Sequence, residues 1–246
     1  MNPTSSPREV APGVFRLGTR WANFYLLVDG PEATLVDAGY PRYAGHVSDA
    51  LESLDLPPHA VTAVVVTHHH VDHVGTAESV RETAGATVYV HARDAPIVRG
   101  DRRSHVPPGF YRHSWRPSMA RYLAHTIAVG GARYRPVRDV QVLNDDGPLD
   151  APGVPRVIET PGHTAGHLSV VLEDRGVLFA GDAMVNFDYA SGRTGVQLHR
   201  FNEDRTRAAA SLASLDSIET DVVLFGHGDP WTGGTQAAVA LARASA

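Results

Sequence analysis

The 246-residue sequence contains no cysteine and no lysine. Without cysteine, disulfides, thiolate nucleophiles and cysteine metal ligands are all excluded. Without lysine, a lysine nucleophile or Schiff base is excluded, so any bound metal must be held by histidine and carboxylate. No apolar run approaches the ~20 residues that a membrane span requires. Residues 1–9 are polar and resemble a loose tail rather than a secretion signal, so the sequence predicts a cytoplasmic protein with no membrane span.

The charge balance also excludes some functions. The formal net charge is −5, which argues against a general nucleic-acid binder because such proteins usually carry a basic excess. Hydrophobic residues make up 43% and charged residues 20% of the chain, as in an ordinary globular protein. We therefore expect a small-molecule partner and no nucleic acid; the composition leaves the oligomeric state open.

Apolar periodicity and turn residues predict an alternation of strands and helices. Strands are expected at 14–17, 24–28, 33–39, 61–66, 87–90, 157–160, 168–172, 177–180 and 222–225. Helices are expected at 46–54, 76–84, 118–129, 202–215 and 235–242. Asn202 is expected to cap the helix that follows it.

The densest group of potential metal ligands directly follows the apolar run at 61–66. It comprises His68, His70, Asp72 and His73. In an extended chain, residues two apart point to the same side, so His68 and His70 can hold one ion together. If the chain then turns into a helix, Asp72 and His73 diverge and can reach a second ion. A surface histidine cluster that binds metal adventitiously would also explain this stretch taken alone.

Three further loops repeat one design, in which a buried strand is followed by glycine and then by a side chain that can bind metal. They supply His163, Asp182 and His227. The carboxyl ends of strands meet at one edge in layered α/β proteins, and glycine allows the backbone to approach closely. Four such loops together favour a built metal site over an adventitious one.

The ordered set His68-x-His70-x-Asp72-His73, Pro161-Gly162-His163-Thr164, Gly181-Asp182 and Gly226-His227-Gly228 resembles the metallo-β-lactamase superfamily, along nearly the whole chain. The resemblance implies an α/β fold, a four-layer αβ/βα sandwich, with residues 10–246 in a single domain. It implies that His68, His70 and His163 hold one zinc, that Asp72, His73 and His227 hold a second, and that Asp182 bridges the two. Asp72 would also act in catalysis, by orienting a metal-bridging hydroxide or protonating the leaving group.

The resemblance favours a dinuclear zinc hydrolase that acts on an ester, lactone or thioester of a small molecule. Lactonases and glyoxalase-II-like thioesterases of this superfamily share the seven-ligand set. A true β-lactamase is disfavoured because such enzymes usually carry an export signal, and a nuclease is disfavoured by the acidic balance. The alternative is a mononuclear non-haem iron dioxygenase of persulfide-type substrates, which uses two histidines and one aspartate; iron or manganese could then replace zinc. A non-catalytic metal-binding protein is the third possibility.

Several residues near these motifs have weaker signals. His69 is expected at the surface or in contact with a ligand, and His167 is expected to support a ligand rather than bind metal. Asp37 ends a strand near the expected site and should make buried hydrogen bonds. Tyr189, Arg193 and His199 follow Asp182 and are candidates for the substrate pocket.

Residues 99–138 interrupt the alternation between the first ligand cluster and His163. The segment mixes arginines with aromatic residues, and an apolar stripe of Met119, Tyr122, Leu123 and Ile127 predicts the helix within it. Long insertions in compact domains are often functional. We predict a lid-like helical segment that covers the metal site and selects the substrate; a packed structural excursion would explain the same pattern.

Overall fold

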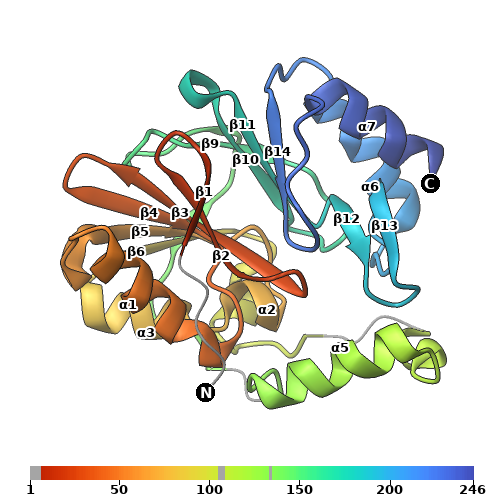
Figure 1. The fold of residues 1–246 in the computed structure, drawn as a ribbon, viewed down its shortest axis with the longest axis horizontal. Coiled ribbons are helices and arrows are strands. Elements are labelled where there is room, and N and C mark those ends of the chain that lie inside the picture. Colours follow the sequence, from red (N-terminus) through yellow and green to blue (C-terminus); the bar gives the residue numbers. More distant parts are fainter. Residues whose placement is uncertain (1–6, 105–108, 133–134) are drawn as a thin grey trace.

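Two β-sheets lie face to face at the centre of the protein, and helices cover their outer faces (Figure 1). A computed structural model describes residues 7–104, 109–132 and 135–246. Arg8 and Glu9, expected in a loose tail, lie in the first strand; residues 1–6 of that tail fall outside the described residues. The same holds for positions 105–108 and 133–134 of the predicted lid.

The first sheet has seven strands in the order β1-β2-β3-β4-β5-β6-β7. They are β1 (Arg8–Ala11), β2 (Val14–Thr19), β3 (Ala22–Asp29), β4 (Glu32–Val36), β5 (Val61–Val65), β6 (Thr87–His91) and β7 (Gln141–Leu143). The strands from β1 to β4 pair antiparallel, whereas those from β4 to β7 pair parallel. The carboxyl ends of β4, β5 and β6 therefore lie at one edge.

The second sheet has five strands in the order β14-β11-β10-β9-β8, and a separate hairpin joins β12 to β13. The strands are β8 (Gly147–Pro148), β9 (Arg156–Glu159), β10 (Leu168–Leu172), β11 (Val177–Gly181), β12 (Met184–Asp188), β13 (Arg193–Leu198) and β14 (Val222–Phe225). The sequence pattern predicts no strands in the stretch that this hairpin occupies. Because β13 pairs back along β12, it returns the chain toward Asp182 at His199.

Alternation along the strands builds three apolar layers. On β3, Phe24 and Leu26 pack toward the helices, whereas Tyr25 and Leu27 pack between the two sheets. On β10, Val171 likewise faces the helices of the second sheet. This period of two is what a strand buried on both faces requires. The predicted αβ/βα sandwich is confirmed.

Helices pack on the outer apolar face of each sheet. α1 (Ala44–Ser53) and α3 (Ala77–Ala84) cover the first sheet, and α6 (Arg205–Ser211) and α7 (Thr235–Ala244) cover the second. The short helices are α2 (Val71–Val74), α4 (Ala95–Val98) and the 3-10 turns η1 (Pro41–Tyr43), η2 (Pro58–Ala60), η3 (Phe110–His113), η4 (Glu173–Arg175) and η5 (Leu212–Leu215). No helix in the described ranges has the length and apolar character that crossing a bilayer requires.

The predicted helix at 202–215 is shorter than expected. α6 begins at Arg205, and the carboxylate of Asp204 accepts the Arg207 N–H at its N-cap. Asn202 is therefore not the cap. Its side-chain oxygen instead lies 3.3 Å from Nδ1 of His163, one of the predicted metal ligands.

The helix expected in the inserted segment is present as α5 (Pro117–Ala128), which lies outside the four layers (Figure 1). Met119 and Tyr122 are buried against Phe187, Tyr189 and Phe201, on or next to the β12–β13 hairpin. Ile127, expected in the same apolar stripe, is 71% exposed. The helix thus packs through its first two turns on the hairpin that follows Asp182.

Candidate metal centre

Four loops at the carboxyl ends of strands bring the predicted ligands together. The loop after β5 and the short helix α2 supply four of them, and the loops after β9, β11 and β14 supply one each. The seven are His68, His70, Asp72, His73, His163, Asp182 and His227. Six are buried and His70 is half-buried. Gly226 makes room for them, because a Cβ at that position would collide with Oδ1 of Asp182.

The first group consists of His68, His70 and His163, whose ligand atoms all lie within 4.8 Å of one another. His70 Nδ1 is 3.0 Å from His68 Nε2 and 3.0 Å from His163 Nε2. Burial lowers the pKa of each of these three imidazoles well below 6.5, and the neighbouring histidines add to the effect. They are therefore neutral at pH 7, the form in which imidazole binds a metal.

Asp182 lies between this group and a second one, formed by Asp72, His73 and His227. Its Oδ2 is 3.5 Å from His163 Nε2 and 3.1 Å from His227 Nε2, while its Oδ1 is 3.7 Å from His73 Nε2. Oδ2 thus lies near the rings of His163 and His227, whereas Oδ1 lies near the ring of His73.

Hydrogen bonds on the far side of four rings fix which nitrogen faces the cluster. His73 Nδ1 is 2.8 Å from the Asp37 carboxylate, and His227 Nδ1 is 2.5 Å from the Trp21 carbonyl oxygen. His163 Nδ1 faces the Asn202 side-chain oxygen, and His68 Nδ1 faces the Thr67 hydroxyl, which itself donates to Asp37. Each oxygen accepts the Nδ1 proton, so a ring that has lost its second proton presents an Nε2 lone pair to the cluster.

Two buried atoms at the centre of the cluster are without a partner among the described residues. They are His73 Nε2 and Asp182 Oδ1. Buried polar groups are almost always satisfied, so such a pair calls for an atom that binds both. A divalent cation fits this position, because lone pairs of imidazole and carboxylate converge on it and they are the ligands that zinc prefers.

His73 carries a proton that a metal would have to displace. Burial lowers its pKa, but the carboxylates of Asp37, Asp182 and Asp72 outweigh burial and raise the pKa to about 10. Without metal, this pairing stabilises the fold fully below pH ~6.5 and is lost as the pH rises through about 10. At pH 8 the ring is therefore protonated in the metal-free protein.

Zinc uptake at pH 8 should accordingly release the His73 proton. Calorimetry in two buffers with different ionisation enthalpies counts the protons released. Asp37→Asn removes the nearest negative charge that raises the His73 pKa, so this variant should release fewer protons for each zinc bound. Any proton lost by zinc-bound water is common to both proteins. Equal proton release from wild type and Asp37→Asn would show that the Asp37 charge does not set how many protons zinc displaces.

His199 and His167 lie beside the cluster but are oriented as hydrogen-bonding groups. His199 Nδ1 accepts the Phe201 N–H at 3.1 Å, so the neutral ring carries its proton on Nε2, which lies 3.5 Å from Asp182 Oδ2. His167 Nε2 accepts the Asp182 N–H at 2.9 Å, and its Nδ1 faces the Thr160 hydroxyl. Neither ring has a free lone pair for a metal. The supporting position predicted for His167 is confirmed.

His199→Leu should therefore leave the zinc content unchanged, although the ligand atoms of His199, His163 and Asp182 lie within 4.8 Å of one another. His163→Leu, which removes a Nε2 lone pair on the adjacent ring, should lose zinc. Metal content after desalting, measured by mass spectrometry, compares the two variants directly. Equal zinc loss from both would mean that His199 is a ligand and that its ring turns when metal binds.

Asp37 makes buried hydrogen bonds, as the sequence predicted, and they join it to the first ligand loop. Its carboxylate accepts the Thr67 N–H at 2.8 Å, the Thr67 hydroxyl at 2.9 Å and the His73 ring N–H at 2.8 Å. The residue has a φ of +63°, a left-handed conformation that aspartate and asparagine adopt more readily than most residues. The turn after β4 thus directs the carboxylate beneath both His68 and His73.

His69 is buried, contrary to the alternative that placed it at the surface. Its backbone N–H and its Nδ1 both lie 3.0 Å from Asp94 Oδ2. The same carboxylate accepts the Thr164 hydroxyl at 2.7 Å and the Gly166 N–H at 2.9 Å. Asp94 therefore ties the first histidine loop to the loop that carries His163. The sequence analysis missed it, and its position just after β6 is the only signal that marks it.

A cavity of about 700 Å³ lies over the cluster. Of the three candidates for the substrate pocket, Tyr189 and His199 line this cavity, whereas Arg193 is exposed and lies outside the lining. The inserted segment supplies part of the wall. Its lining residues in the described ranges are Gly100, Arg102, Arg103, Ser104, Phe110, Tyr111, Tyr122, Leu123, Thr126, Ile127, Gly131, Ala132 and Pro136.

Tyr122 connects the inserted helix to the cluster. Its ring stacks on Tyr189 with centroids 3.8 Å apart, and its hydroxyl lies 3.5 Å from Asp72 Oδ2. Tyr40 donates to the Tyr122 hydroxyl at 3.2 Å, and the Tyr40 hydroxyl is 2.9 Å from that of Thr126. Burial raises the pKa of Tyr122 well above 10, so the hydroxyl keeps its proton and can donate it to Asp72.

A two-sheet sandwich with a histidine and carboxylate centre at its strand ends defines a class of metal-binding proteins. The sequence profile of the metallo-β-lactamase superfamily matches residues 18–227. The chain belongs to this superfamily, and the resemblance inferred from its motifs is confirmed. The match begins within β2 and ends at His227, so it spans all seven predicted ligands.

Relatives of known sequence and structure agree with this assignment. The chain is 32% identical over 241 residues to the "Probable metallo-hydrolase YflN" of Bacillus subtilis, covering 92% of this chain and 87% of that protein. It is 30% identical over 172 residues to a hydroxyacylglutathione hydrolase of Nitrobacter hamburgensis, covering 70% of this chain and 51% of the relative. A metallo-β-lactamase family protein from Thermus thermophilus has a TM-score of 0.68 at 28% identity, over 96% of this chain and 80% of that one.

Proposed function

We propose that the protein is a hydrolase that binds two zinc ions and cleaves an ester, lactone or thioester of a small molecule. The proposal rests on the position of Asp182, whose carboxylate lies within 3.7 Å of imidazoles from both ligand groups. His68, His70 and His163 would hold one ion, Asp72, His73 and His227 the other, and Asp182 both. Bound zinc would lower the pKa of water toward ~7 and polarise a carbonyl.

The chain's own residues would then direct the reaction. Asp72 is buried at 6% exposure beside His227 and under the Tyr122 hydroxyl, which orients its carboxylate. From that position it can hold the attacking water or deliver a proton to the leaving group. His199 presents a neutral N–H toward Asp182 and the cavity, and such a donor can stabilise an oxyanion. The relative named hydroxyacylglutathione hydrolase supports transfer of an acyl group to water.

The activity is tested by a panel of lactones, thioesters and phosphodiesters on zinc-loaded protein, with metal content measured on the same sample. The proposal predicts close to two zinc ions per chain and turnover of at least one lactone or thioester. One iron per chain, with oxygen consumption on a persulfide, would support the dioxygenase alternative. Turnover of phosphodiesters alone would overturn the assignment to acyl substrates.

We further propose that residues 99–138 act as a cover that selects the substrate. Support comes from the described part of the segment, whose aromatic and aliphatic side chains line the cavity together with the metal-centre residues. α5 is fixed to the β12–β13 hairpin by Met119 and Tyr122, so the cover and the Asp182 loop form one packed unit. A cavity of about 700 Å³ falls within the range of small-molecule sites, ~300–1,000 Å³.

A further inference from the structure

Charge is distributed very unevenly along this chain. Nine of its 22 arginines but only one of its 27 acidic residues, Asp101, lie within residues 99–138. The segment therefore carries +8, whereas the remainder of the chain carries −13, and the two values sum to the net −5. A strongly basic segment in an acidic protein attracts anions to its surface.

Some of these arginines are paired within the protein. Arg99 lies 3.1 Å from the Asp101 carboxylate, and Arg135 lies 2.6 Å from that of Glu82. Arg102 and Arg103 both line the cavity over the ligand cluster. Histidines aside, the charged lining residues in the described ranges are these two arginines together with Asp72 and Asp182.

The two kinds of charge occupy different depths of the cavity. Asp72 and Asp182 are 6% and 1% exposed, whereas Arg102 and Arg103 are exposed residues. The lining also includes Phe110, Leu123 and Phe201, whose side chains offer apolar surface to a ligand. The cavity thus has a buried metal-binding floor, apolar lining and a cationic mouth.

We propose that Arg102 and Arg103 bind a carboxylate or phosphate at the end of the substrate remote from the scissile bond. The inference rests on the proposed function, because it takes the acyl carbon to lie at the metal centre. Guanidinium groups suit this role, since they bind carboxylate and phosphate through paired, charge-assisted hydrogen bonds. The substrate class is then an acyl compound with an apolar middle and an anionic tail.

Matched thioesters test this orientation. One series keeps a neutral thiol and ends its acyl chain in methyl, carboxylate or phosphate; the other keeps the acyl chain and varies the thiol in the same way. In at least one series an anionic member should be preferred, and Arg102→Gln/Arg103→Gln should raise its KM about tenfold while leaving kcat and the neutral member unchanged. The preferred anion, carboxylate or phosphate, identifies the tail.

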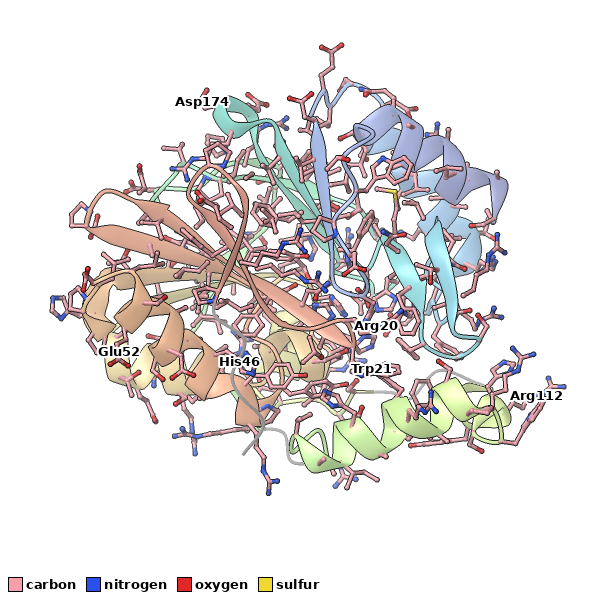
Figure 2. The ribbon with its side chains drawn as sticks, viewed as in Figure 1. Arg20, Trp21, His46, Glu52, Arg112 and Asp174 are labelled. Atoms are coloured by element: carbon pink, nitrogen blue, oxygen red, sulfur yellow. The ribbon has the colours of Figure 1, made fainter. Side chains whose placement is uncertain are left out.

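The control is Arg112→Gln/Arg121→Gln, which removes the same charge from the same segment. Both arginines are exposed and neither lines the cavity. Arg112 lies in η3 and points away from the rest of the protein (Figure 2). This variant should keep the wild-type KM for the anionic thioester. A preference for the neutral member in both series, or equal effects of the two double variants, would overturn the proposal.

A binding measurement separates this inference from the proposed hydrolysis. If no thioester is cleaved, the hydrolase proposal fails, but the arginine site is still tested by titrating octyl phosphate into the metal-loaded protein. Phosphate can also bind the metals, so the comparison is between variants. The Arg102→Gln/Arg103→Gln protein should bind octyl phosphate about tenfold more weakly than wild type, and Arg112→Gln/Arg121→Gln should bind equally well. Identical dissociation constants in all three proteins would overturn the inference.

Discussion

Asp182→Ala should abolish the second metal ion and nearly all hydrolysis together. The carboxylate faces His163, His73 and His227. Burial raises its pKa, but His227, His73 and His199 outweigh burial and hold the pKa well below the usual range, so the carboxylate is fully charged. Alanine would leave two cations close together with no anion between them. Loss of several kcal/mol of metal-based transition-state stabilisation corresponds to a fall in kcat/KM of ~10³-fold or more. Zinc content should fall from two per chain to at most one.

Asp188→Ala is the matched control for this substitution. Asp188 is also a buried aspartate in the chain that follows β11, but its carboxylate binds Arg200 and Ser191 rather than the metal cluster. This variant should lose stability yet retain both zinc ions and its activity per folded molecule. Zinc analysis and steady-state kinetics on the two proteins, side by side, decide the matter. Full zinc content in Asp182→Ala would refute the bridging role.

Asp37→Ala should destabilise the metal-free protein by ~3–6 kcal/mol and weaken zinc binding by ~10–100-fold. It leaves the Thr67 N–H, the Thr67 hydroxyl and the His73 ring N–H without their buried acceptor. It also places alanine at a φ of +63°, where a Cβ is unfavourable. Denaturant unfolding and zinc titration report the two effects separately.

Asp37→Asn helps to separate the two causes of the stability loss in Asp37→Ala, the missing charge and hydrogen bonds and the unfavourable backbone conformation. Asparagine tolerates the left-handed conformation and keeps one acceptor oxygen, so about half of the loss in stability should return. The zinc affinity should recover less, because the neutral amide no longer favours the ring orientation of His73 through charge. If Asp37→Ala unfolds at the wild-type denaturant concentration, the carboxylate does not hold the loop.

The predicted ligands could be read from the sequence because each stands at a recognisable boundary. His68, His163, Asp182 and His227 all follow a strand of apolar residues, and the last three directly follow glycine. A strand buried on both faces leaves a continuous apolar signature, and its end fixes where the next polar side chain must lie. Local patterns therefore predicted that these side chains lie at one edge of the fold, whereas their division into two ligand groups came from the resemblance to the metallo-β-lactamase superfamily.

Other parts of the site depend on contacts that no local pattern records. The tautomer of His199 depends on the hydrogen bond from the Phe201 N–H. The carboxylate of Asp94 joins two loops that are distant in the sequence, and that contact exists only in the folded chain. The β12–β13 hairpin was missed because Asn186 and Asp188 interrupt its apolar alternation. Tertiary hydrogen bonds satisfy both residues: Asn186 donates to the Asp229 carbonyl, and Asp188 accepts from Arg200.

A crystal structure of the zinc-loaded protein, with anomalous data collected on both sides of the zinc edge, tests the central claim most directly. The account predicts two peaks flanking the Asp182 carboxylate, with ligand distances of ~2.0–2.2 Å to the seven predicted residues and with His199 outside that range. A single peak, or density in which Asp182 or His227 points away from the metal, would contradict the dinuclear centre.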